Sequence, residues 1–103
     1  MVTCKDVVDF SVTHIGQGEA NQFGYQCVAY VAWVSRVLGI GLDCFCEVTG
    51  GAQDIWGHSA PDGWHKVAGN PSDDNASRTI YNNLPDGAIV VFTGGSYGHI
   101  AVK

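Results

Sequence analysis

The sequence predicts an α+β domain in which two N-terminal helices pack on a small antiparallel sheet. Three observations carry this prediction: helical spacing of apolar residues over 4–14, an apolar run over 27–38 that stops at glycines, and two β-rich runs at 88–92 and 97–102. A chain of 103 residues has room for a single two-layer core, and its hydrophobic share of 46% is ordinary for a globular protein. We therefore expect one domain over residues 1–103.

The first helix is expected over residues 4–14. Thr3 and Asp6 have the spacing of a capping box, and apolar residues follow at helical intervals until Gly16. The second helix is expected over residues 27–38, because Gly39 ends a segment that is apolar on nearly all sides. A helix with so little polar surface must lie inside the domain, packed on the sheet.

The C-terminal residues predict a β-hairpin. The runs 88–92 and 97–102 are rich in β-branched and aromatic residues, and the turn-forming stretch 93–96 joins them. Side chains alternate along a strand, so Tyr97, His99 and Ala101 should share one face of the hairpin, opposite Ile100 and Val102.

The middle of the chain carries weaker signals. Residues 52–56 predict a helical turn, residues 64–67 a short strand, and residues 70–77 a loop of Asn, Pro, Ser and Asp.

Charge and hydropathy exclude several classes of partner. Five basic residues and a net charge of −5 leave no basic patch for nucleic acid. The longest apolar run, 28–38, is far shorter than the roughly 20 residues of a membrane span. Residues 1–6 lack the charged and apolar regions of a signal peptide, which predicts that the chain is made in the cytoplasm.

Cys44 and Cys46 are too close in the sequence for a comfortable disulfide, and this pair with scattered histidines does not have the usual spacing of a zinc site. Cys4, Cys44 and Cys46 are expected to be buried thiols that fill space in the core. We predict no metal and no cofactor.

Cys27 directly follows a polar segment that contains a glycine. It begins the second predicted helix, where unpaired N–H groups and the positive end of the helix dipole favour a thiolate. A reactive thiolate requires a base, and His99 stands on a predicted strand some distance along the chain. A nucleophilic Cys on a helix followed by a His on a strand is the layout of papain-like hydrolases, although an isolated Cys in an apolar helix more often serves packing.

Two motifs in this order resemble the CHAP family, the cysteine, histidine-dependent amidohydrolases and peptidases. The first is the run 24–33, Gly-Tyr-Gln-Cys-Val-Ala-Tyr-Val-Ala-Trp, and the second extends over 83–92 and 97–102. The resemblance implies a papain-like fold and cleavage of an amide bond in bacterial peptidoglycan, within the peptide or between sugar and peptide. It also implies a bacteriolytic phage endolysin, which reaches the wall through a holin.

The resemblance also implies roles for individual residues. Cys27 corresponds to the nucleophile and His99 to its base, and the Gln26 side chain and the Cys27 N–H are expected to stabilise the oxyanion. We expect Tyr25, Trp56 and Tyr97 to line the substrate cleft, with a core position as the alternative for Trp56.

Two departures from the family pattern affect these expectations. The stretch 18–23 has a single carboxylate, so we predict no calcium site there. The acidic or amide residue that usually orients the histidine follows on the next strand, so we expect the domain to be truncated after the His99 strand. The alternative is that the orienting group comes from another chain or from elsewhere in the fold, for example from His58, Asp54 or Asn82.

An exposed strand edge would also allow pairing with a second copy or a partner chain, and a separate wall-binding domain would help to target the enzyme. Two alternatives remain at this point: a non-catalytic wall-binding or regulatory module, and a papain-like peptidase that acts on proteins.

Overall fold

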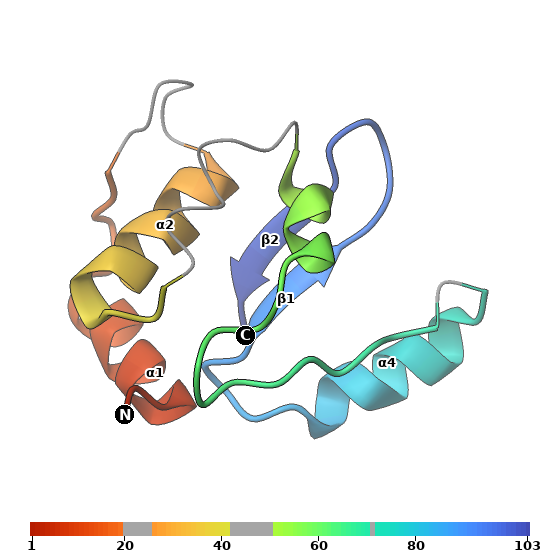
Figure 1. The fold of residues 1–103 in the computed structure, drawn as a ribbon, viewed down its shortest axis with the longest axis horizontal. Helices are drawn as coiled ribbons and strands as arrows, with labels where there is room; N and C mark the ends of the chain where they lie inside the picture. Colours follow the sequence, from red (N-terminus) through yellow and green to blue (C-terminus); the bar gives the residue numbers. More distant parts are fainter. Residues whose placement is uncertain (20–25, 42–50, 71) are drawn as a thin grey trace.

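The fold is α+β, as predicted. The computed structural model describes residues 1–19, 26–41, 51–70 and 72–103. The helices are α1 (Cys4–Thr13), α2 (Cys27–Leu38) and α4 (Asp74–Asn83), with a 3-10 helix, η1 (Ala52–Gly57). Strands β1 (Ile89–Phe92) and β2 (His99–Val102) form an antiparallel hairpin (Figure 1).

Helix α1 begins with the predicted capping box. The Thr3 side chain accepts a hydrogen bond from the Asp6 N–H, and the Asp6 carboxylate accepts one from the Thr3 N–H at 2.8 Å. Phe10 packs edge-on against Trp33 of α2, with 5.1 Å between ring centroids. The capped helix is thus joined to α2 through aromatic contacts.

Helix α2 is the central element, and its bounds agree with the sequence prediction. Gly39 ends it with a φ of 75°, a left-handed conformation that glycine adopts without strain. Ala29, Val31, Ala32 and Val34 are buried, most of its other apolar residues are half-buried, and the helix packs against β2. This arrangement confirms the prediction of an internal helix on the sheet.

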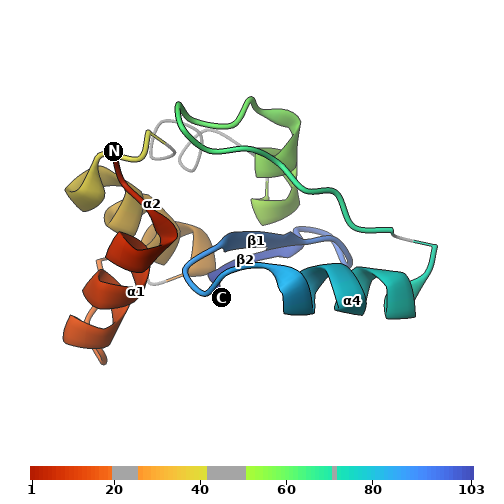
Figure 2. The same ribbon diagram turned by 90° about the horizontal axis from the view of Figure 1, so that it is seen from below.

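The hairpin presents one face to the core. Val91 pairs with Ile100 and Ile89 with Val102, so these four side chains share a face. Ile100 lies in one buried cluster with residues of both α2 and η1: Val31, Ala32, Ala52 and Ile55. Figure 2 shows the sheet nearly edge-on, with η1 above it and α4 on the side away from α1 and α2.

Two predictions for the middle of the chain are wrong. Residues 64–67 form no strand: Trp64 packs on the cluster around Val7 and Phe10, while the Lys66 ammonium donates to the Trp56 carbonyl at 2.5 Å. The predicted loop 70–77 contains the start of α4, because the Asp73 carboxylate accepts a hydrogen bond from the Ala76 N–H at 3.0 Å and caps the helix. The predicted turn at 52–56 is confirmed as η1.

Within the described parts of the chain, no helix has the length and hydropathy needed to cross a membrane. Cys44 and Cys46 lie outside the described residues. Cys4 and Cys27 are free thiols, each half-buried, and each is the first residue of its helix.

Candidate active site

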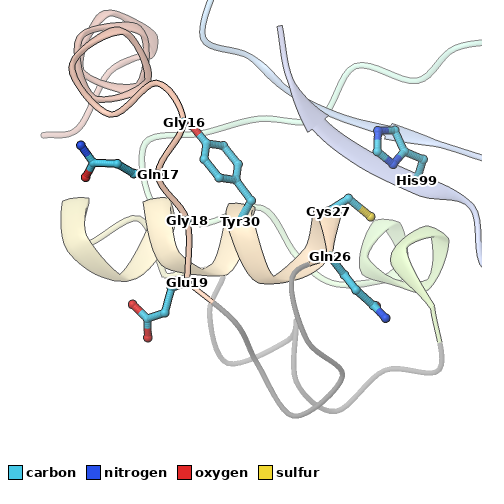
Figure 3. A pocket seen from close by; sticks show the side chains of 8 residues that line it. All are labelled: Gly16, Gln17, Gly18, Glu19, Gln26, Cys27, Tyr30 and His99. Atoms are coloured by element: carbon cyan, nitrogen blue, oxygen red, sulfur yellow. The ribbon is translucent and has the colours of Figure 1, made fainter.

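An open pocket of about 820 Å³ lies between the start of α2, the segment after α1 and the start of β2. The described residues that line it come from these three parts of the chain: Gly16, Gln17, Gly18, Glu19, Gln26, Cys27, Tyr30 and His99 (Figure 3). Three of the six predicted site residues, Gln26, Cys27 and His99, therefore share one pocket although they are far apart in the sequence.

Cys27 is held by the first turn of α2. Gln26 caps the helix in an extended conformation, with φ −125° and ψ 167°, and its carbonyl accepts a hydrogen bond from the Tyr30 N–H at 3.1 Å. Cys27 is half-buried and packs against the core cluster that contains Val31 and Ile100. The N–H groups of a first helical turn have no partner within the helix, so this thiol lies where negative charge is favoured.

His99 is the first residue of β2. It is exposed on the hairpin face opposite the buried Ile100, as the alternation of side chains predicted. Its cross-strand partner is Phe92, and the two rings stack with centroids 5.9 Å apart and planes 25° apart. The imidazole therefore stands on a regular strand with an aromatic ring against one side.

Figure 3 shows the Cys27 sulfur turned toward β2, from which the His99 ring extends. Both side chains line this pocket, and no hydrogen bond joins these two described residues. Hydrogen bonds between catalytic groups are often long before substrate binds. A thiol and an imidazole that line one pocket are the types of group that can serve as nucleophile and base in acyl transfer.

Tyr30 and the segment 16–19 also line the pocket, and neither was predicted to do so. Tyr30 follows Cys27 by three positions on α2, a spacing that puts both on the same side of a helix and could have indicated it. Its hydroxyl donates to the Ser11 hydroxyl at 3.2 Å, which links the pocket wall to α1. Glu19, which also lines the pocket, forms an ion pair with Arg36 at 3.0 Å.

Three other predicted cleft residues are placed differently. Trp56 is 40% exposed on η1, with the Lys66 ammonium 5.0 Å from its ring centre, and Tyr97 is 66% exposed in the loop before β2. Neither is among the described residues that line the pocket, and Tyr25 lies outside the described residues.

The residues considered for orienting His99 also lie elsewhere. Asp54 is on η1, and His58 follows that helix. Asn82 is near the end of α4, where its carbonyl accepts a hydrogen bond from the Lys103 ammonium at 3.4 Å. None of the three is among the described residues that line the pocket.

The described residues contain no group of three or more His, Cys, Asp and Glu side chains arranged to hold a metal ion. Most of the stretch 18–23, where calcium was considered, lies outside the described residues.

The pocket agrees with a family match. A family model described as the CHAP domain matches residues 16–102, a range that extends from the pocket wall at Gly16 through Cys27 to the His99 strand. No curated protein and no solved structure gives a significant match. CHAP domains are generally amidases or peptidases with peptidoglycan-related substrates. The chain belongs to the CHAP-domain family.

Proposed function

We propose that this chain hydrolyses an amide bond of bacterial peptidoglycan, within the peptide or between sugar and peptide, with Cys27 as nucleophile and His99 as general base. The observation that carries the proposal is the shared pocket of Cys27 at the start of α2 and His99 at the start of β2. Family membership supplies the substrate class.

The proposed reaction has two stages. The Cys27 thiolate attacks the amide carbon and forms a tetrahedral intermediate; the C–N bond then breaks as the His99 imidazolium donates its proton to the leaving amine. A water molecule, deprotonated by His99, attacks the resulting thioester. Collapse of this second intermediate releases the carboxylic acid and regenerates the thiolate.

Both intermediates carry negative charge on the former carbonyl oxygen. We assign its stabilisation to the Cys27 N–H, at the unpaired end of α2, and to the Gln26 side-chain amide, which also lines the pocket. The Cys27 N–H is fixed by the first turn of α2, so it requires little reorganisation as the charge forms.

A papain-like arrangement of helix and sheet is part of the proposal, supported by the packing of α2, which carries the nucleophile, on the strand that carries the base. We also propose that the protein is a phage lysin, made in the cytoplasm and released to the wall through a holin. Cells that produce the chain should lyse only when a membrane-permeabilising protein is made with it.

The direct test is a zymogram on purified bacterial walls. The parent chain should clear the gel, and Cys27→Ala should not, because alanine removes the nucleophile and a single small side-chain change leaves the fold. Cys4→Ala is the matched control, since Cys4 is also half-buried at the first position of a helix but does not line the pocket; it should remain active.

Other outcomes of the same test would contradict the proposal. No clearing by the folded parent would favour a non-catalytic wall-binding module. Cleavage of casein without cleavage of peptidoglycan would favour a protein peptidase. If the parent is active, mass spectrometry of the released fragments identifies which amide is cut.

Alkylation separates the effect of His99 from that of the helix dipole. Cys27 and Cys4 both begin helices, so a dipole alone should activate both thiols to a similar degree. If His99 stabilises the Cys27 thiolate, iodoacetamide at neutral pH should modify Cys27 faster than Cys4, Cys44 or Cys46. Equal rates for all four in the folded protein would remove the basis for an activated Cys27.

A further inference from the structure

The loop that leads into β2 determines where His99 begins its strand. It comprises residues 93–98 between β1 and β2, and Gly94, Gly95 and Gly98 all have positive φ values, of 136°, 61° and 67°. Within the loop, the Gly98 N–H donates to the Gly94 carbonyl at 3.0 Å. Glycines restrict their own backbone little, so contacts from outside the loop add to this internal hydrogen bond in fixing its conformation.

Gln53 of η1 makes such contacts at three points. Its backbone N–H donates to the Tyr97 carbonyl at 2.9 Å, its side-chain Nε2 donates to the Ser96 carbonyl at 3.2 Å, and its Oε1 accepts from the Gly94 N–H at 3.4 Å. A glutamine amide carries a donor and an acceptor, and both are used here on the same loop. In Figure 1, η1 lies beside the end of the hairpin from which this loop extends.

The backbones at this contact approach too closely for side chains. A Cβ added to Gly98 would lie 2.6 Å from the Gln53 Cβ and 2.5 Å from the Phe92 carbonyl oxygen. A Cβ added to Gly51, just before η1, would lie 2.8 Å from the Tyr97 carbonyl oxygen. The loop is therefore held on η1 by hydrogen bonds and by close packing, directly before His99.

From this contact we infer that Gln53 is a positioning residue of the active site, which holds the 93–98 loop and thereby sets the place of the His99 imidazole opposite Cys27. The inference rests on the proposed function, because it assigns Gln53 a role through the base of that reaction. Gln53 does not line the pocket among the described residues, so it acts on His99 through Gly98 and the start of β2.

The test uses Gln53→Met, which keeps the length of the side chain and removes both side-chain hydrogen bonds. Loss of two such bonds should lower the iodoacetamide modification rate of Cys27 at neutral pH, and the rate of peptidoglycan hydrolysis, by about three- to tenfold. Lys66→Met is the matched control: it removes a hydrogen bond from Lys66 to η1 at the Trp56 carbonyl, and should leave both rates within about twofold of the parent.

The cysteine readout separates positioning from general destabilisation. Loss of the fold exposes all thiols and raises the modification of Cys4, whereas a displaced His99 lowers the modification of Cys27 alone. A Gln53→Met protein that modifies Cys27 at the parent's rate would overturn the inference. So would a parallel rise in the modification of Cys4 and Cys27.

His99→Ala distinguishes failure of this inference from failure of the proposed function. If His99→Ala slows Cys27 modification and hydrolysis while Gln53→Met leaves both unchanged, only the role of Gln53 is wrong. If His99→Ala changes neither rate, the proposed function fails and the role of Gln53 fails with it.

Discussion

Truncation of Ile100 should detach the hairpin from the rest of the fold. An isolated two-stranded hairpin is marginally stable in water, so this sheet depends on the elements packed against it. Ile100 is 1% exposed and lies in one cluster with side chains of α2 and η1. It is also the residue after His99, so its packing anchors the strand that carries the proposed base.

The loss of unfolding free energy can be estimated from the number of buried carbons that the substitution removes. Ile100→Ala removes three carbons, each with a transfer free energy of about 0.8 kcal/mol, which gives about 2.4 kcal/mol. The cavity that remains raises the loss of unfolding free energy to about 3 to 4 kcal/mol. For a domain of this size the melting temperature should fall by about 12 to 30 °C. Ile100→Val, which removes one carbon, should cost about 1 kcal/mol and about 4 to 8 °C.

Circular dichroism melting of the parent and variants measures these shifts. Val12→Ala on α1 is the control, because Val12 is 62% exposed and its truncation should change the unfolding free energy by less than about 0.5 kcal/mol. An Ile100→Ala protein that melts within about 4 °C of the parent would refute the account of the hairpin as a docked element.

Three further predictions concern the capping box of α1, the 93–98 loop and binding to bacterial walls. The Asp6 carboxylate accepts hydrogen bonds from the Thr3 backbone N–H and hydroxyl, which lower the pKa of Asp6 below its ordinary 3.8. Ionised Asp6 therefore stabilises the fold above about pH 4, and this stabilisation is lost as the pH falls through the lowered pKa. Urea unfolding across this range should show that loss in the parent and not in Asp6→Asn. Gly98→Ala should lower the unfolding free energy by about 1 to 3 kcal/mol, because Gly98 has a positive φ and lies close to the Phe92 carbonyl. The control is Gly57→Ala, which has open space around it and should change the unfolding free energy by less than about 0.5 kcal/mol in the same circular dichroism melting experiment. With five basic residues, the chain alone should sediment poorly with anionic walls and improve when fused to a wall-binding module; tight, salt-insensitive binding by the chain alone would contradict this.

The elements with strong local signals were predictable from the sequence. The capping box at Thr3 and Asp6 determined the start of α1, and Gly39 the end of α2. Alternation along β2 separated the exposed His99 from the buried Ile100. In each case a local physical requirement determined the structure: a helix cap, a glycine with positive φ, or the two-residue alternation of side chains along a strand.

Helix α4 and the absent strand at 64–67 were not predictable from local composition. Asp and Asn favour turns, so the residues around Asp73 resemble a loop in the sequence. The same hydrogen-bonding ability allows the Asp73 side chain to cap a helix. Strand formation at Trp64 would require a partner strand, and Trp64 instead packs against the cluster of α1 and α2. The loop contacts of Gln53 likewise depend on tertiary structure, since they join residues more than 40 positions apart.

Helix α4 has a different relation to the core from that of α1 and α2. None of the residues of α4 is buried, and hydrogen bonds connect this helix to the rest of the chain. The Ser77 hydroxyl accepts from the Asn70 N–H and donates to the Asn70 carbonyl. The Lys103 ammonium donates to the Asn82 and Leu84 carbonyls. Substitutions on its outer surface therefore leave the packing of α2, η1 and the hairpin unchanged. Helix α4 is thus attached to the domain by polar contacts and not by a buried apolar face, so we expect substitutions on its exposed side to affect stability less than substitutions in α2.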